Sequence, residues 1–148
     1  MDPKRQITAL FVGLGSIGTR HLKNLHNLCT DRGWTLQADA LRSDLQRPLR
    51  DGVADLLHAQ YTDLANAPAQ YDMVFITNPT SLHAEALQQV RGRGKALFIE
   101  KPIFSAEQTD LNLADYLPAD QKAYVAAPMR WCGVMLALKD LLPTLHPY

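Results

Sequence analysis

Cysteine, net charge and long apolar runs are all scarce in this sequence. Its 148 residues include only two cysteines, Cys29 and Cys132, which lie far apart. This count argues against a disulfide framework or a zinc knuckle and is typical of a reducing compartment. The 15 basic and 15 acidic residues give zero formal net charge, which disfavours nucleic acid as the main ligand. No apolar stretch is long enough for a signal sequence or a membrane span, so we expect a cytoplasmic protein with no membrane partner.

A glycine-rich turn near the N-terminus is the most informative stretch that is present. The apolar run from Ile7 to Val12 predicts a buried strand, and a helical pattern follows it after a short turn. The turn carries Gly13-x-Gly15-x-x-Gly18, and the order of strand, glycine turn and helix is the phosphate-binding fingerprint of dinucleotide folds. In that interpretation Gly13 allows a tight turn, Gly15 leaves room for a pyrophosphate, and Gly18 lets the helix pack closely. A purely structural glycine turn is the alternative.

Strand-like and helix-like segments alternate along the whole chain. Short apolar runs predict strands, and amphipathic or capped stretches between them predict helices. The predicted strands are 7–12, 35–41, 71–77, 96–99 and 123–127. Residues 61–64 are predicted to be a connection that can include a short edge strand. The predicted helices are 16–28, 46–59, 64–69, about 80–90, 105–116 and 132–142. This alternation predicts an α/β fold with a doubly wound, mostly parallel sheet.

The end of the second predicted strand decides which dinucleotide is expected. A site selective for NAD usually places a carboxylate there, and Asp39 is the acid on this strand. If the strand continues to Leu41, Asp39 lies inside it and the tip reads Arg42-Ser43. An arginine with a hydroxyl at this place suits a 2′-phosphate, so we expect NADP in preference to NAD. The alternative is that Arg42 is a solvated loop residue.

Three further motifs follow later strands. They are Thr77-Asn78-Pro79 with His83, Phe98-Ile99-Glu100-Lys101-Pro102, and Met129-Arg130-Trp131. Together with the glycine turn and His21, these motifs resemble the nucleotide-binding domain of the glucose–fructose oxidoreductase / inositol dehydrogenase (Gfo/Idh/MocA) family. The resemblance covers nearly the whole chain, and the Glu-Lys-Pro motif after a strand makes it specific.

The resemblance implies an NAD(P)-dependent oxidoreductase that acts on a sugar, a cyclitol or a related polyol. It implies catalytic roles for Lys101 and Glu100 beside the nicotinamide, where the lysine contacts the substrate, and no metal site is expected. The cofactor-binding positions expected from the resemblance are Gly13, Gly15, Ser16, Ile17, Gly18, Thr77, Asn78, Pro79, His83, Glu100, Lys101, Arg130 and Trp131. Arg42 and Ser43 join this set from the argument on the second strand.

The residue chemistry agrees with that assignment. Loops after the carboxyl ends of strands line the ligand crevice of open α/β sheets. A lysine there can polarise a carbonyl or handle a hydroxyl proton, and Glu100 would orient its ammonium group. Structural alternatives remain open: Lys101 as a surface lysine, His83 as a packing residue at a helix start, and Arg130 as the partner of a local acid. His21 is expected to be a packed or surface histidine.

The expected domain organisation places one dinucleotide-binding domain at residues 1–128. Residues 129–148 are expected to form the crossover and the first helix toward a second, substrate-binding domain that lies outside this chain. Since that domain supplies half of the substrate pocket and the oligomer interface in the family, we expect the 148-residue chain to be inactive alone and the full-length parent to be a homo-oligomer. Two alternatives stay open: a non-catalytic dinucleotide-binding or sensing module, and a biliverdin-reductase-like enzyme with a non-sugar substrate.

Overall fold

One six-stranded sheet forms the centre of the protein. The computed structural model describes residues 5–50 and 52–142. The strands are β1 (Gln6–Val12), β2 (Thr35–Leu41), β3 (Ala59–Tyr61), β4 (Tyr71–Ile76), β5 (Gly94–Ile99) and β6 (Lys122–Val125). Every pairing between them is parallel, and their order across the sheet is β3-β2-β1-β4-β5-β6. This is the strand order of doubly wound dinucleotide-binding folds, so the predicted fold class is confirmed.

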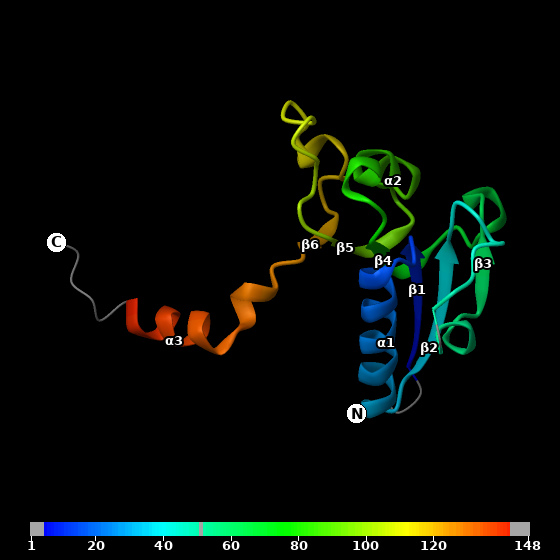
Figure 1. Ribbon diagram of the computed structural model, residues 1–148, viewed down its shortest axis with the longest axis horizontal. Helices are drawn as coiled ribbons and strands as arrows, with labels where there is room; N and C mark the ends of the chain where they lie inside the picture. The colour runs from blue at the N-terminus through cyan, green and yellow to red at the C-terminus, as the bar shows by residue number, and fades with distance from the viewer. Residues whose placement is uncertain (1–4, 51, 143–148) are drawn as a thin grey trace.

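Apolar strand residues pack against a helix on each face of the sheet. On one face, Phe11 of β1 shares a buried cluster with Leu22 and Leu25 of α1 (Ser16–Asp31). On the other face, Val74 of β4 shares a second cluster with Leu87 of α2 (His83–Gln89). Figure 1 shows α1 running beside β1, with α2 near β4. Because both faces of the central strands are covered, these strands read as continuous apolar runs.

The winding of the sheet reverses between β1 and β4. Val12, the last residue of β1, lies opposite Leu41 of β2 on one side and Ile76 of β4 on the other. Ile76 in turn lies opposite Ile99, the last residue of β5. These four strands therefore end level, and the loops that follow them share one edge of the sheet. Open α/β sheets bind ligands at this edge, beside the point where the winding reverses.

The segment from Gln46 to Ala59 is not the helix that its apolar spacing predicts. Its described residues, 46–50 and 52–58, form a loop with one short 3₁₀ turn, η1 (Ala54–Leu56), before β3 begins at Ala59. Gly52 adopts φ +69°, a left-handed conformation that cannot continue a right-handed helix. Val53 is nevertheless fully buried, so the apolar residues of this segment still reach the core on the α1 face.

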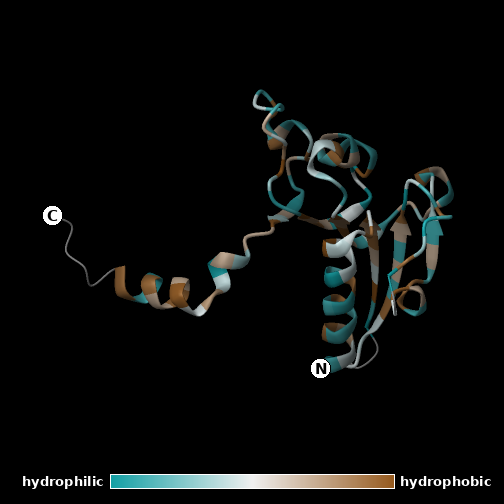
Figure 2. Cartoon of the chain, in the orientation of Figure 1, coloured by the Kyte–Doolittle hydropathy of each residue, from teal (hydrophilic) through white to brown (hydrophobic). Residues whose placement is uncertain are grey.

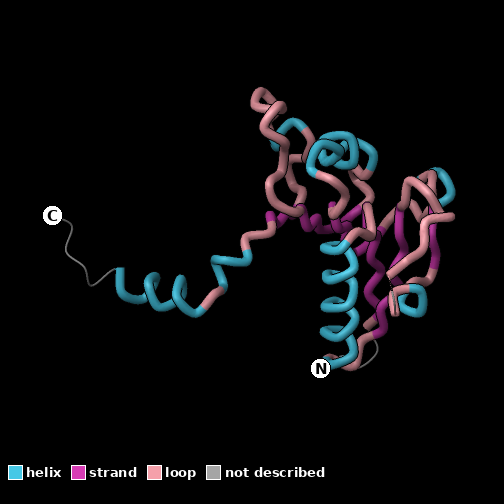
Figure 3. The backbone as a smooth tube through the Cα atoms, in the orientation of Figure 1, coloured by secondary structure: helices cyan, strands magenta, loops and turns pink. Residues whose placement is uncertain are grey.

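The helix predicted over 105–116 is also wrong. Ser105-x-x-Gln108 has the capping-box pattern of a helix start, and the backbone N–H of Ser105 does donate to Gln108 Oε1 at 3.0 Å, but no helix follows it. A new 3₁₀ turn, η4 (Leu113–Asp115), starts instead after Asn112, whose side chain accepts from the N–H of Ala114. Figure 3 shows most of this region as loop, with one short helical turn. Side-chain bonds to nearby backbone groups therefore hold the segment in turns.

The last helix, α3 (Gly133–Leu141), extends away from the sheet (Figures 1 and 2). Its position agrees with the helix predicted over 132–142, but none of its residues is buried. Its exposed apolar side chains are Val134, Met135, Leu136, Leu138 and Leu141. Among the described residues, no helix is long and apolar enough to cross a membrane. Residues 143–148, which include Pro143 and Pro147, lie outside the described residues.

Candidate functional site

Two of the three glycines in the turn after β1 are required by close packing. Gly13 adopts φ +86°, and a Cβ atom there would lie 2.8 Å from the Cα atom of Asn78. A Cβ atom on Gly18 would lie 2.4 Å from the carbonyl oxygen of Gly13 and 2.7 Å from Thr77 Oγ1. Real Cβ contacts are never this short, so both positions need glycine. The turn is thereby pressed directly against the end of β4.

Gly15 differs, because a Cβ atom on this residue would meet no other atom within 4 Å. It is exposed and occupies the N-cap position of α1, where no side chain caps the helix and no acidic residue lies in the first turn. The first N–H groups of a helix lack partners within the helix, and the positive end of its dipole attracts anions. Ser16 is also exposed, and Ile17, the next residue of the helix, is half-buried. This open space at a helix N-terminus is therefore suited to an anionic group.

The loop after β4 borders the glycine turn. Thr77 is buried, and its hydroxyl donates to the carbonyl oxygens of Gly13 at 2.7 Å and Val12 at 3.2 Å. Asn78 packs on Gly13 as described above, and Pro79 follows on the surface. The loop and the glycine turn therefore form one continuous structure.

His83 is buried behind this loop. Its Nε2 atom lies 3.0 Å from the carbonyl oxygen of Asn78, and its Nδ1 atom lies 3.0 Å from that of Ile103. Only 1% of the residue is exposed. His83 thus ties the loop after β4 to the loop after β5 through their backbones.

The loop after β5 carries the Glu-Lys-Pro motif. Glu100 donates its backbone N–H to Ile76 at 3.0 Å, which continues the sheet. Its carboxylate Oε1 lies 2.7 Å from His21 Nε2, and Oε2 accepts the backbone N–H of Lys101 at 3.1 Å. The carboxylate therefore contacts the backbone of Lys101, whereas the sequence led us to expect a contact with its ammonium group. The Lys101 side chain is exposed, and the Lys101–Pro102 peptide is cis.

Asp39 does not lie at the tip of β2. It is completely buried. One carboxylate oxygen accepts a hydrogen bond of 2.8 Å from the hydroxyl of Tyr71, and the other lies 3.1 Å from His58 Nδ1. Burial and the bond to Asp39 raise the pKa of Tyr71 well above its ordinary value, so the phenol keeps its proton. The expectation that Asp39 sits inside the strand is confirmed.

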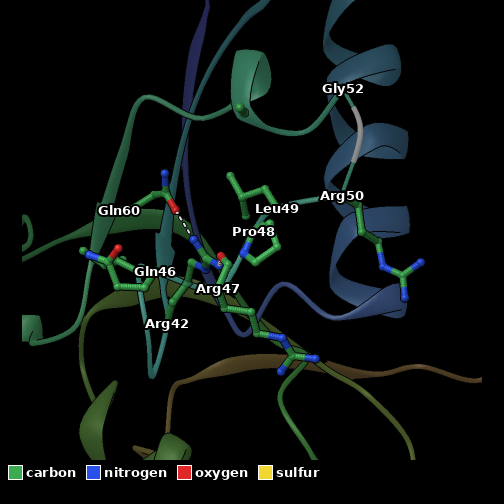
Figure 4. Close-up of a pocket in the computed structure, with 10 residues that line it drawn as sticks. Arg42, Gln46, Arg47, Pro48, Leu49, Arg50, Gly52 and Gln60 are labelled. Carbon is green, nitrogen blue, oxygen red and sulfur yellow. Dashed lines mark hydrogen bonds between the residues drawn. The ribbon is translucent and has the colours of Figure 1, made fainter.

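Arg42 instead lies at the end of β2, beside an open hollow of about 440 Å³ (Figure 4). Its guanidinium group donates to Gln60 Oε1 at 2.6 Å and to the carbonyl oxygen of Arg47. Arg47 and Arg50 also line the hollow, and none of the lining residues within 5–50 and 52–142 is acidic. The neighbouring Ser43 is exposed on the same loop. Three arginine residues therefore line a hollow with room for an anionic group at this end of the sheet.

Arg130 and Trp131 lie on the 3₁₀ turn η5 (Pro128–Trp131), beyond the end of β6. The indole N–H of Trp131 donates to the hydroxyl of Tyr124 at 2.8 Å, and the Tyr124 ring packs on Phe98, with 5.6 Å between ring centroids. Arg130 is exposed. These residues lie at the far side of the motif loops and begin the segment that leads to α3.

The structure thus brings the loops after β1, β4 and β5 together and places Arg42 further along the same sheet edge. Two residues in this arrangement were not expected to contribute, His21 and Gln60. His21 contacts Glu100, which lies far away in the chain, and Gln60 contacts Arg42 across two strand ends. His21 already belongs to the motifs that carry the resemblance, one helical turn after the glycine fingerprint, but no sequence signal pointed to its contact with Glu100. Within the described residues, no group of His, Cys, Asp or Glu side chains could hold a metal ion.

Comparison with known proteins identifies the family. Residues 7–124 match the model of the Gfo/Idh/MocA oxidoreductase family, described as having an NAD-binding Rossmann fold. The chain belongs to this family. The resemblance expected from the motifs is therefore confirmed for most of the chain, including the glycine turn and the Glu-Lys-Pro loop.

Similar proteins agree with this membership. The chain is 30% identical over 116 residues to the uncharacterized oxidoreductase YrbE of Bacillus subtilis, a match that covers 74% of the chain and 32% of YrbE. It is 28% identical over 101 residues to scyllo-inositol 2-dehydrogenase (NAD(+)) of the same bacterium. This match covers 68% of the chain and 29% of the dehydrogenase. The structure of the WlbA dehydrogenase from Bordetella pertussis, in complex with NADH and UDP-GlcNAcA, has the same fold, with a TM-score of 0.75 at 17% identity.

Coverage is unequal in these comparisons. The WlbA match covers 95% of this chain but 42% of WlbA, and the chain spans about a third of the two curated relatives. The chain itself is an NAD-binding-type Rossmann domain of an oxidoreductase family.

Proposed function

We propose that this chain is the cofactor-binding part of an NAD(P)-dependent oxidoreductase that transfers a hydride to or from a sugar, a cyclitol or a related polyol. The observation that carries the proposal is the open space at Gly15, at the N-terminus of α1 and at the sheet edge where the winding reverses. The choice of substrate class follows from family membership and from the cyclitol named for a relative with 28% identity.

The glycine turn is the proposed pyrophosphate site. Gly13 and Gly18 press the turn against Thr77 and Asn78, and this packing holds the first N–H groups of α1 toward the open space at Gly15. Ser16 and Ile17 form the rim, and Pro79 with the buried His83 supports the adjoining loop. Rigid backbone donors that are already in place bind an anion without a large ordering penalty.

Lys101 is the proposed catalytic residue of the same site. The cofactor supplies the hydride chemistry when it is bound. The exposed ammonium group of Lys101, next to the sheet edge, would polarise a substrate carbonyl or stabilise the alkoxide formed from a hydroxyl. Glu100 acts on Lys101 because its carboxylate accepts a hydrogen bond from the backbone N–H of Lys101. Arg130 and Trp131 would border the nicotinamide end of the site.

The arginine-lined hollow at the end of β2 supports a preference for NADP. A 2′-phosphate needs cationic donors at this place and is repelled by a carboxylate. Among the residues that the structure describes, Arg42, Arg47 and Arg50 line the hollow with no acidic neighbour in its lining, and the carboxylate of Asp39 is engaged inside the sheet. Ser43 adds a hydroxyl to the same loop.

The segment 129–148 is proposed to lead into a substrate-binding domain, with assembly of the whole protein into a homo-oligomer. The support is that α3 carries exposed apolar side chains and that family relatives are much longer than the chain. Under this proposal the 148-residue chain binds the dinucleotide but does not turn over substrate.

Calorimetric titration of the chain with NADPH and with NADH tests the proposal. We expect saturable binding of both with a stoichiometry of about one, set by the single glycine turn, and a lower Kd for NADPH. Binding of NADH but not NADPH would contradict the role proposed for Arg42 and would still support the proposed pyrophosphate site. Binding of neither cofactor by folded protein would overturn the proposed site.

A further inference from the structure

His21 and Glu100 form a close pair that joins the phosphate-binding helix to the Glu-Lys-Pro loop. The Nε2 atom of His21, on α1, lies 2.7 Å from Oε1 of Glu100, which directly follows β5. Both side chains are largely buried, with 19% of the histidine and 12% of the glutamate exposed. A hydrogen bond between a ring N–H and a carboxylate at this distance is short and strongly directional.

The imidazole ring is itself held in position by aromatic neighbours. Its edge packs on Phe98, with 4.7 Å between ring centroids, and it stacks at 6.2 Å from Phe75. Phe98 and Phe75 are neighbours in the sheet, one on β5 and the other on β4. The ring therefore has little freedom to turn, and its Nε2 atom presents a fixed partner to Glu100.

The other oxygen of Glu100 controls the first residue beyond the sheet. The backbone of Glu100 is fixed by its N–H bond to Ile76, and the next N–H, that of Lys101, donates to Glu100 Oε2 at 3.1 Å. The direction in which the chain leaves the sheet at Lys101 thus depends on the orientation of the Glu100 carboxylate. That orientation is set by His21 through the opposite oxygen.

We propose that His21 is a positioning residue that, through Glu100, fixes the backbone at Lys101 and so orders the nicotinamide half of the cofactor site. The proposal rests on the proposed function for the part that concerns the cofactor. Its physical basis is the chain of contacts from α1 to His21, to the Glu100 carboxylate and to the Lys101 N–H. Without the ring nitrogen, a partly buried carboxylate loses its partner and turns toward water, which releases that N–H.

Amide hydrogen exchange of the ¹⁵N-labelled chain, followed by NMR, tests the contact chain without any ligand. His21→Phe keeps a ring on Phe98 and removes the nitrogen, whereas His21→Gln offers an amide N–H at nearly the place of Nε2. We expect the Lys101 amide to exchange at least about tenfold faster in His21→Phe and to return to nearly the wild-type rate in His21→Gln. His26→Phe, on the same helix, is the matched control and leaves that rate unchanged.

A general loosening of the fold would accelerate the amides of β5 as well, so the Phe98 amide serves as the internal reference. If His21→Phe fails to fold, Glu100→Ala removes the acceptor from the other side and is expected to give the same acceleration at Lys101. An unchanged Lys101 rate in the folded variant, or a His21→Gln variant that exchanges as fast as His21→Phe, would overturn the proposal.

Cofactor binding supplies the second readout and separates this proposal from the proposed function. We expect His21→Phe to weaken NADPH binding about tenfold and to leave binding of 2′,5′-ADP, which lacks the nicotinamide half, within about twofold. Equal affinities of wild type and variant for NADPH would overturn the effect on the site. If wild-type protein binds neither probe, the proposed function fails, while the exchange experiment still decides whether His21 positions Lys101.

Discussion

The hydroxyl of Tyr71 donates a hydrogen bond of 2.8 Å to the carboxylate of Asp39 across strand β1. Asp39 is completely buried, and His58 Nδ1 contacts its other oxygen at 3.1 Å. A buried carboxylate is tolerated only when its oxygens have such partners. The pair therefore belongs to the interior of the sheet, and the Asp39 carboxylate does not reach the proposed ribose end of the cofactor site beside Arg42.

Replacing Tyr71 by Phe removes the donor and leaves part of a buried carboxylate without a partner. We expect the free energy of unfolding to fall by about 1.5–3 kcal/mol, the usual range for a hydrogen bond to a charged group. Urea denaturation at pH 7 measures it. Tyr124→Phe is the matched control: its hydroxyl accepts from the exposed Trp131, so a change within about 0.5 kcal/mol is expected. Equal effects of the two substitutions would contradict the special role of the Asp39 pair.

Gly15→Val is expected to abolish dinucleotide binding and to leave the fold intact. The added side chain would occupy the space proposed for the pyrophosphate, while its Cβ atom meets nothing within 4 Å in the protein. Titration with NADPH reports the loss of binding, and the free energy of unfolding is expected to stay within about 0.5 kcal/mol. Gly133→Val, at another glycine with an open Cβ position, is the control that keeps full affinity. Unchanged affinity in Gly15→Val would refute the site.

Gly18→Ala is expected to have the opposite profile, a loss of stability. Its Cβ atom would lie 2.4 Å from the Gly13 carbonyl oxygen, which belongs to the backbone and cannot simply rotate away. The helix must then move off the turn, and forcing an extra methyl group into a packed region destabilises by about 1–3 kcal/mol. Thermal and urea unfolding measure this effect. A stability equal to wild type would mean that α1 packs less closely than the structure shows.

Arg42→Ala is expected to discriminate between the two cofactors. Loss of a guanidinium that binds a phosphate typically removes about 1.5–3 kcal/mol, so NADPH binding should weaken about tenfold to a hundredfold. NADH has no 2′-phosphate, and its Kd should change less than about twofold. Arg91→Ala, whose side chain bonds the carbonyl oxygen of Asp115 on another part of the surface, is the charge-matched control. Equal losses for both cofactors would show that Arg42 does not read the 2′-phosphate.

The features that could be predicted from the sequence are those encoded locally. Three features that depend on residue spacing and apolar runs were predicted. They are the glycine turn, the strand that ends at Leu41 and the buried strand before Thr77. The sequence also indicated that Asp39 lies inside its strand, because residue count alone places it before the tip. Family membership followed from short motifs, each attached to the end of a strand.

What could not be predicted depends on contacts between distant residues or on single backbone conformations. Gly52 at φ +69° breaks an amphipathic pattern that otherwise suits a helix, and the pattern gives no sign of that angle. The contact between Ser105 and Gln108 has the pattern of a helix cap, yet in the structure it holds a turn. His21 and Glu100 lie 79 positions apart, so only the parallel sheet brings them together. The orientation of the Glu100 carboxylate was therefore missed.

Asp72, near the start of β4, makes a stability contribution that should depend on pH. Its carboxylate accepts the Lys95 ammonium at 2.7 Å and both the backbone N–H and the hydroxyl of Thr8 at 3.0 Å. These bonds, the one from Lys95 foremost, hold the pKa of Asp72 below its ordinary value of 3.8. A lowered pKa in the folded state means that the stabilisation is fully present above the unfolded-state pKa and is lost as the pH falls through the folded-state value.

Asp72→Asn is therefore expected to lower the free energy of unfolding by about 1 kcal/mol at pH 7. The difference from wild type should stay constant down to about pH 5 and then shrink toward zero near pH 2, because wild-type Asp72 becomes neutral there as well. Urea denaturation at a series of pH values measures this difference. Asp110→Asn, at an exposed loop position, is the matched control and should follow wild type throughout. A difference between Asp72→Asn and wild type that persists undiminished at pH 2 would mean that the charge on Asp72 contributes nothing to stability.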